Sequence, residues 1–158
     1  MDFLETALKR NPKLVDAAFE LHNTRQIPTD TYLVDLDSVK YNARAISEAA
    51  RQFSVKNYFM TKQFARNPLI SKVIVDAGIE SAVAINVDEA KILHGYGFRV
   101  DHVGHLMQIP SRDVEFIVNK LRPEIITVYS LEKAREIERA ARKSNIKQKI
   151  MLRPIKPG

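Results

Sequence analysis

From Thr31 onward, short apolar runs alternate with amphipathic stretches, and this alternation constrains the fold more than any other feature of the chain. Strands are predicted at residues 31–36, 57–60, 81–85, 102–106, 125–128 and 149–153. Helical spacing of apolar residues follows each of the first five runs. One strand and one helix therefore recur roughly every 22 to 30 residues, the spacing of βα units with short loops. The pattern predicts a parallel α/β fold.

Two architectures are compatible with this alternation. An open, doubly wound sheet of five strands suits a chain of 158 residues. A closed (β/α)8 barrel needs about 250 residues, so this chain would supply only part of one, with about five barrel strands after the first strand is set aside. Residues 1–26 are predicted to form an N-terminal helical lead-in, and residues 27–158 the α/β portion. Spacing alone leaves the choice between open sheet and partial barrel open.

Composition excludes several classes of protein. No run approaches the roughly 18 apolar residues of a membrane span, and the N-terminus lacks the pattern of a secretory signal, so a cytoplasmic protein is expected. Without cysteine there is no disulfide, thiolate nucleophile or Cys-based metal site. The formal charge of +6 is interleaved with acidic residues, except over 142–149, where a helix is predicted to end. Nucleic-acid binding is therefore not expected.

Lys62 is the principal candidate for chemistry. It follows the apolar run Tyr58-Phe59-Met60, at the carboxyl end of a predicted parallel strand, where α/β folds place their active sites. A lysine at the rim of a low-dielectric core can lose its proton and add to an aldehyde as an imine. The alternative interpretation of the same position is an ordinary solvated loop lysine.

Other polar residues also follow predicted strands. Arg66 precedes the helix start at Asn67, and its guanidinium with the free amides of that helix is suited to an anion such as a phosphate. Asn86 either caps the next helix, with Glu89 completing a capping box, or reaches into a site. Arg153 ends the last predicted strand and points either to solvent or into a polar site.

The two histidines near the fourth strand are weighed as ligands. His102 and His105 lie three residues apart, so they are predicted to point to opposite faces of the strand and not to hold a metal together. His105 is nearer the carboxyl end and is the better candidate for facing a site, although a core or rim histidine with satisfied hydrogen bonds is the alternative. No metal site is predicted.

Three segments together carry a resemblance to a known family. They are residues 31–42 (TYLVDLDSVKYN), 58–62 (YFMTK) and 84–90 (AINVDEA). This combination resembles the N-terminal part of the alanine racemase group, the fold-type III enzymes that use pyridoxal 5′-phosphate (PLP), and in particular an amino-acid racemase-like branch of that group. The resemblance spans roughly residues 27–153 and favours the partial (β/α)8 TIM-type barrel, preceded by N-terminal helices and one additional strand.

The resemblance implies a set of roles. Lys62 would form the internal aldimine with PLP and act as acid and base at the substrate Cα. Arg153 would lie beside the cofactor ring oxygen, and Asn86 and His105 would contribute to the cofactor site. Arg66 stands where the alanine racemases carry a phosphate-contacting tyrosine, so a different phosphate contact is implied. The substrate would be a small amino acid.

The resemblance also bears on partners. The second acid/base that racemisation requires comes, in this family, from a partner subunit, so a homo-oligomer or a complementary C-terminal chain is expected. The other function that we consider is a non-catalytic α/β half-barrel that binds a partner chain. These alternatives differ in one observable property, since only the first requires PLP to bind at Lys62.

Overall fold

The computed structural model describes residues 2–153, and the chain divides into two units, residues 1–39 and 40–158, each of which is described by itself. The first unit holds α1 (Phe3–Arg10) and α2 (Pro12–Asn23). Asn11 separates them and caps α2, since its side chain accepts a hydrogen bond from the Leu14 amide. The proline at the first position of α2 is compatible with a helix start because that amide needs no partner. The prediction of N-terminal helices is confirmed.

The strand predicted at residues 31–36 is wrong. Residues 31–35 belong to no strand, and α3 (Leu36–Gln52) begins directly after them. The reason is local: the Asp35 carboxylate accepts hydrogen bonds from the amides of Asp37 and Ser38, which is the geometry of a helix N-cap. The aspartate at 35, followed three residues later by a serine, was the sequence signal for this helix start.

The second unit contains a parallel sheet whose strands follow one another in chain order. The strands are β1 (Ser81–Ala84), β2 (Arg99–Val103), β3 (Ile125–Val128) and β4 (Lys149–Leu152), and the order across the sheet is β1-β2-β3-β4. All three pairings are parallel. A doubly wound sheet reverses its strand order at a switch point, whereas a barrel adds each strand beside the preceding one. The sequential order therefore decides for the partial barrel.

The first predicted barrel strand, residues 57–60, is reduced to one bridge. Phe59 pairs in parallel with Ala82; its amide donates to the Ser81 carbonyl at 3.1 Å, and its carbonyl accepts from the Val83 amide at 2.9 Å. The segment thus occupies the position of a fifth parallel strand beside β1. It does not extend further because the short turn η1 (Lys62–Phe64) begins three residues after Phe59.

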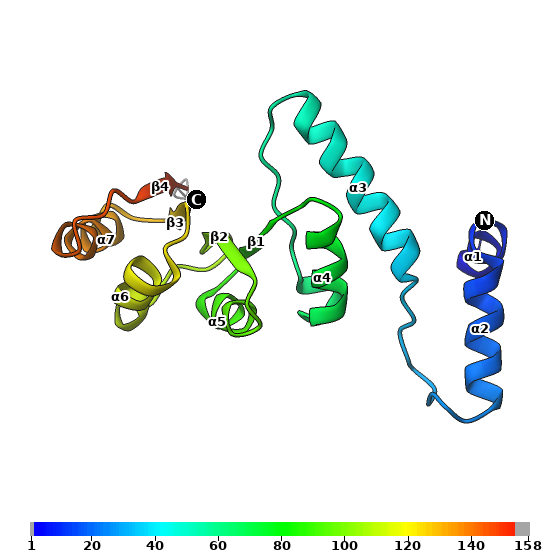
Figure 1. The fold of residues 1–158 in the computed structure, drawn as a ribbon. Helices are drawn as coiled ribbons and strands as arrows, with labels where there is room; N and C mark the ends of the chain where they lie inside the picture. The colour runs from blue at the N-terminus through cyan, green and yellow to red at the C-terminus, as the bar shows by residue number, and fades with distance from the viewer. Residues whose placement is uncertain (1, 154–158) are drawn as a thin grey trace. The chain divides into compact units, whose positions relative to one another are not determined.

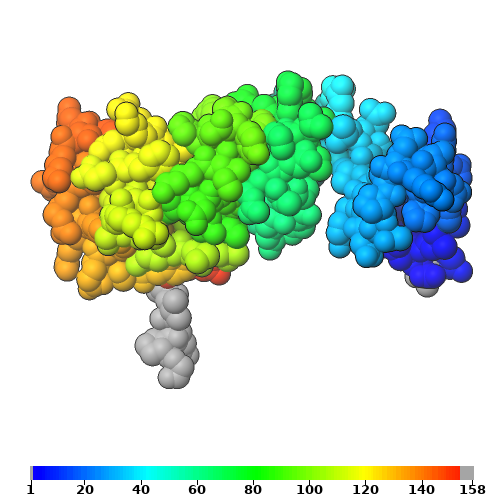
Figure 2. All heavy atoms as spheres, turned by 90° about the horizontal axis from the view of Figure 1, so that it is seen from below, coloured from blue at the N-terminus to red at the C-terminus, as the bar shows by residue number. Residues whose placement is uncertain are grey.

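The helices cover one face of this sheet. They comprise α4 (Pro68–Asp76), α5 (Val87–Gly95), the helical stretch η2 (Ser111–Asp113), α6 (Val114–Phe116) and η3 (Ile117–Leu121), and α7 (Leu131–Lys143). Figure 1 shows α5, α6 and α7 on the same side of the strands, and Figure 2 shows them side by side on that side. Helices on a single side, each joining one strand to the next, are typical of a barrel wall.

The core lies between the sheet and these helices. Leu93, Ile117 and Ile137 from the helices and Val103 and Ile126 from the strands are at most 1% exposed. The opposite face of the sheet carries His102 and Thr127, which are buried polar residues. Strand residues alternate between the two faces, so the apolar residues that point to the helices leave this second face available for polar groups.

Candidate functional site

The site is built along the carboxyl ends of the strands. Because the strands are parallel and sequential, the segments that follow them lie at one edge of the sheet. These segments contain the predicted site residues Lys62, Asn86, His105 and Arg153, with Arg66 further along the first of them. The topology thus assigns every predicted site residue to the edge where α/β proteins bind ligands.

Lys62 opens the turn η1 and is exposed. The preceding residue, Thr61, is fully buried, so the backbone is anchored immediately before the lysine side chain leaves the core. Within residues 2–153 the Lys62 ammonium makes no hydrogen bond or ion pair. The amine is therefore available to a ligand at this edge.

The loop around Arg66 is tightly folded. The amides of Phe64 and Arg66 both donate to the Thr61 carbonyl at 3.2 Å. Ala65 and Arg66 adopt left-handed backbone conformations, with φ values of 50° and 60°. Asn67 then starts α4. This loop keeps Lys62 and Arg66 in one short segment.

The expected free amides at the start of α4 are not available. The Asn67 side chain accepts hydrogen bonds from the amides of Leu69 and Ile70, at 2.9 and 3.3 Å, and Pro68 has no amide hydrogen. The prediction of an anion site on these amides is wrong, because the cap residue already satisfies them. An anion at this loop would depend on the half-buried Arg66 guanidinium.

The loop is tied to the end of β1 through Glu89. The Thr61 hydroxyl donates to one Glu89 carboxylate oxygen at 2.6 Å, and the Ile85 amide donates to the other at 2.7 Å. Asn86 caps α5 by accepting from the Glu89 amide at 2.8 Å, which confirms half of the predicted capping box. The other half is wrong, since the Glu89 side chain bonds Ile85 and Thr61 and not the cap amide.

Arg153 and His105 are brought into contact. The Arg153 guanidinium donates to the His105 carbonyl at 2.9 Å, so of the two orientations considered for Arg153 it turns toward the strand ends. Tyr129, which sequence reasoning missed, donates its hydroxyl to the carbonyls of His105 and Gly104, at 2.8 and 3.1 Å. An aromatic residue directly after the strand 125–128 was the available signal. These bonds join the ends of β2, β3 and β4.

The prediction that His102 and His105 face opposite ways is wrong. Their ring centroids lie 5.6 Å apart in an edge-to-face arrangement. Strand β2 ends at Val103, and Gly104, with a φ of 82°, turns the chain so that alternation no longer applies. Burial, followed by the proximity of His105, lowers the pKa of His102. Its Nε2 atom lies 2.7 Å from the Thr127 hydroxyl.

The remaining predicted residue, Asn86, approaches the same turn from the other side. Its side-chain amide lies 3.8 Å from the Met107 sulfur, and the Met107 amide donates to the Ile85 carbonyl. The structure therefore brings these residues together in two separate groups. Lys62 and Arg66 share one loop, and His105 and Arg153 meet at the ends of β2 and β4. No side-chain hydrogen bond joins Lys62 to Asn86, His105 or Arg153 in the described part of the chain.

The fold is the N-terminal part of a (β/α) barrel, with Lys62, Arg66 and Arg153 on the segments that follow its strands. Residues 34–153 match the family described as alanine racemase, N-terminal domain. The chain belongs to that family.

Two known proteins show how far the similarity extends. The chain is 36% identical over 151 residues to the uncharacterized protein YhfX of Escherichia coli (strain K12). This match covers 96% of this chain and 39% of that protein. D-threonine aldolase from Filomicrobium marinum has a similar structure, with a TM-score of 0.64 and 17% identity over 80% of this chain and 34% of that chain. This chain thus spans well under half the length of either protein. No helix described in residues 2–153 has the length and apolar content needed to cross a membrane.

Proposed function

We propose that this chain forms the cofactor-binding part of a PLP-dependent amino-acid racemase, with Lys62 as the lysine that holds the cofactor. One observation carries the proposal: the sequential parallel strands assign Lys62, Asn86, His105 and Arg153 to a single edge of the sheet. Membership of the alanine racemase N-terminal-domain family supports it. The chain would act with further protein, either a second copy or a complementary C-terminal chain.

The chemistry of the donor set fits PLP. The cofactor carries an aldehyde, which requires an amine, and a phosphate, which requires cationic or amide donors. Lys62 is an amine without a carboxylate partner among the described residues, and Arg66 lies in the same loop. Arg153 uses one guanidinium nitrogen on the His105 carbonyl, which leaves its other donors for a ring oxygen.

Each residue then has a defined task. PLP, when bound, withdraws electrons from the Cα of an attached amino acid. Lys62 would hold the cofactor through its aldehyde carbon and would take or return the proton at the substrate Cα. Arg66 binds phosphate, while Asn86 and His105 border the site from the ends of β1 and β2. Racemisation needs a second acid/base on the opposite face of Cα, which we assign to a partner subunit.

The test is covalent trapping of PLP on the protein. Mixed with PLP, the wild-type chain is expected to develop a yellow absorbance, and borohydride reduction followed by peptide mapping should place the label on Lys62. Lys62→Arg should abolish that absorbance, because a guanidinium does not condense with the aldehyde. Lys120→Arg, at an exposed lysine of η3, is the matched control. Labelling spread evenly over exposed lysines would contradict the proposal.

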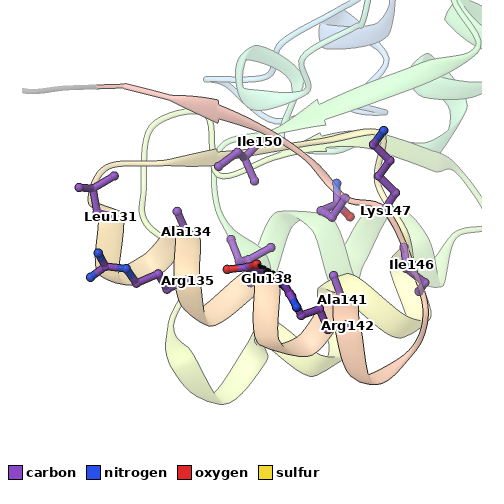
Figure 3. A pocket seen from close by; sticks show the side chains of 11 residues that line it. Leu131, Ala134, Arg135, Glu138, Ala141, Arg142, Ile146, Lys147 and Ile150 are labelled. Carbon is purple, nitrogen blue, oxygen red and sulfur yellow. Dashed lines mark hydrogen bonds and ion pairs between the residues drawn. The ribbon is translucent and has the colours of Figure 1, made fainter.

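A second function, a half-barrel that binds a partner chain without catalysis, is supported by the surface around β4. Ile150, Met151 and Leu152 are 45–50% exposed. A groove of about 380 Å³ lies between α7 and β4. Figure 3 shows Ile150 and Ala134 projecting into it. Its other apolar lining includes Ile137 and Ile146.

This second function makes a separate prediction. Saturable binding to a chain that supplies the neighbouring barrel strands, with no spectral change on addition of PLP, would favour it. Ile150→Asp should then weaken partner binding, because it places a charge in the apolar groove. Arg135→Asp, which changes a charged residue lining the same groove, is the control for charge alone.

A further inference from the structure

Glu89 is a buried carboxylate in the first turn of α5, and that turn does not need it as a cap. Its side chain is 1% exposed, whereas its neighbour Asp88 is exposed. Asn86 already caps the helix by accepting the Glu89 amide hydrogen. A carboxylate removed from water is costly unless donors replace the water, and here both oxygens have protein donors. The role of this side chain therefore lies in what it joins.

The Glu89 side chain joins Thr61 to α5. The Thr61 hydroxyl donates to Glu89 at 2.6 Å, and the Thr61 carbonyl accepts from the amides of Phe64 and Arg66. Thr61 is fully buried and directly precedes Lys62. Two of the backbone hydrogen bonds that fold the Lys62 loop therefore converge on Thr61, a residue that Glu89 also binds.

The loop requires such a restraint. Two consecutive residues, Ala65 and Arg66, have positive φ values, a conformation that residues other than glycine rarely adopt. A segment of this kind persists only where the surrounding structure holds it. The second oxygen of Glu89 accepts from the Ile85 amide at the end of β1, so Glu89 also ties the loop to the neighbouring strand.

We propose that Glu89 is a positioning residue that, through Thr61, holds the Lys62 loop at the carboxyl edge of the sheet. This inference rests on the proposed function, because it concerns the presentation of Lys62 to the cofactor aldehyde. Glu89 does not itself touch the cofactor. It acts by fixing the backbone from which the Lys62 side chain extends.

Paired variants of the two residues test this role. Thr61→Val removes the hydroxyl at nearly constant shape, and Glu89→Met removes both acceptors at similar length. Thr61→Ser retains the donor. Glu89→Gln retains a tie, since its oxygen accepts from Ile85 and its amide donates to the hydroxyl of Thr61, which rotates to accept. Asp88→Asn removes one charge from the same helical turn without touching the tie.

Two readouts are measured on each variant: amide hydrogen exchange, which needs no cofactor, and the yield of PLP trapped on Lys62 by borohydride. In Thr61→Val and Glu89→Met, exchange at Phe64 and Arg66 should rise about tenfold or more, and trapping should fall about fivefold or more. Strand amides such as that of Ile126 should exchange as in the wild type. Thr61→Ser, Glu89→Gln and Asp88→Asn should resemble the wild type.

The outcomes separate this inference from the proposed function. Wild-type exchange at Phe64 and Arg66 in both disrupting variants would overturn the positioning role. So would equally faster exchange throughout the sheet, or failure of both variants to fold, because Glu89 would then serve general stability. If the wild type traps no PLP on Lys62 while the two amides respond as expected, the cofactor assignment fails and the restraint on the loop stands.

Discussion

The two edges of the parallel sheet use charge differently. At the amino edge, cations and carboxylates are paired with one another: Lys56 with Glu124 and Asp101, Arg99 with Asp101, and Lys149 with Glu124. These pairs connect the segment before Phe59 with β2, β3 and β4. Lys149 and Glu124 join the neighbouring starts of β4 and β3, whereas Lys56 reaches past β1 to β2 and β3.

At the carboxyl edge, the cations of the predicted site have no such partners. Within residues 2–153, Lys62, Arg66 and Arg153 form no ion pair with a carboxylate, and Glu89, a buried carboxylate at this edge, is bonded to neutral donors. Cations without carboxylate partners at one edge are what the proposed binding of an anionic cofactor there requires. The comparison teaches that ion pairs connect strands at the amino edge, whereas the proposed function would use the unpaired cations of the carboxyl edge for binding.

The largest expected effect comes from the two glycines that flank β2. Gly97 and Gly104 have nearly the same φ, 83° and 82°, but a Cβ at Gly104 would lie 3.0 Å from the Thr127 carbonyl, whereas one at Gly97 would meet no atom within 4 Å. Gly104→Ala should lower the free energy of unfolding by about 3 kcal/mol, and Gly97→Ala by about 1 kcal/mol. Urea titration of both variants measures the difference.

Equal losses at the two glycines would contradict the close packing inferred at the carboxyl edge. Both substitutions carry the same backbone strain, so the contrast between them isolates the close contacts at Gly104 with the carbonyls of Thr127 and Met107. A larger loss at Gly97 would reverse the comparison.

The next effect separates binding from stability. Arg66→Gln should weaken PLP binding about tenfold or more, because a charge-assisted contact to phosphate is lost, and should change the unfolding free energy by less than about 0.5 kcal/mol. Lys56→Gln should do the reverse, lowering stability by about 1 kcal/mol with PLP affinity unchanged. Absorbance titration and urea unfolding of both variants provide the measurements. A loss of PLP affinity in Lys56→Gln would break the proposed division between the edges.

The smallest effect is a pH dependence of stability at the amino edge. Hydrogen bonds from Lys56 and then Lys149 lower the pKa of Glu124 from 4.5 to about 2. The folded state therefore binds this proton less readily than the unfolded chain. The contribution is complete above pH 4.5 and is lost as the pH falls toward about 2. Because the side chain is 30% exposed, solvent screening reduces the contribution to about 1 kcal/mol.

The comparison with Glu124→Gln isolates this contribution, since other lowered carboxyl pKa values act equally on both proteins. The difference in unfolding free energy between wild type and variant should shrink between pH 5 and about pH 2. A difference that stays constant over that range would show that Glu124 gains nothing from its lysine partners.

Much of the local structure followed from the sequence. The caps at Asn67 and Asn86 were recognisable because each side chain bonds an amide two or three residues away. A local cap also accounts for the error at residues 31–36. An apolar run suggested a strand there, although the Asp35 side chain bonds the Asp37 amide and starts a helix.

The candidate site was predictable only in part. Lys62, Asn86, His105 and Arg153 were recognised as strand-end residues, and their roles stay predictions. Glu89 was taken for half of a capping box, and Tyr129 was missed. Both contact residues more than 20 positions away, at distances in sequence that no local pattern describes.

The sequence by itself determined most of the alternation of strands and helices after residue 57, because burial of apolar side chains repeats with the period of each element. It also determined that polar residues follow the strands. Tertiary structure alone decided that the strands are sequential, that His102 and His105 meet across Gly104, and that Thr61 is bound by Glu89. These depend on hydrogen bonds and contacts between segments brought together by folding, and periodicity within one segment carries no information about its neighbour.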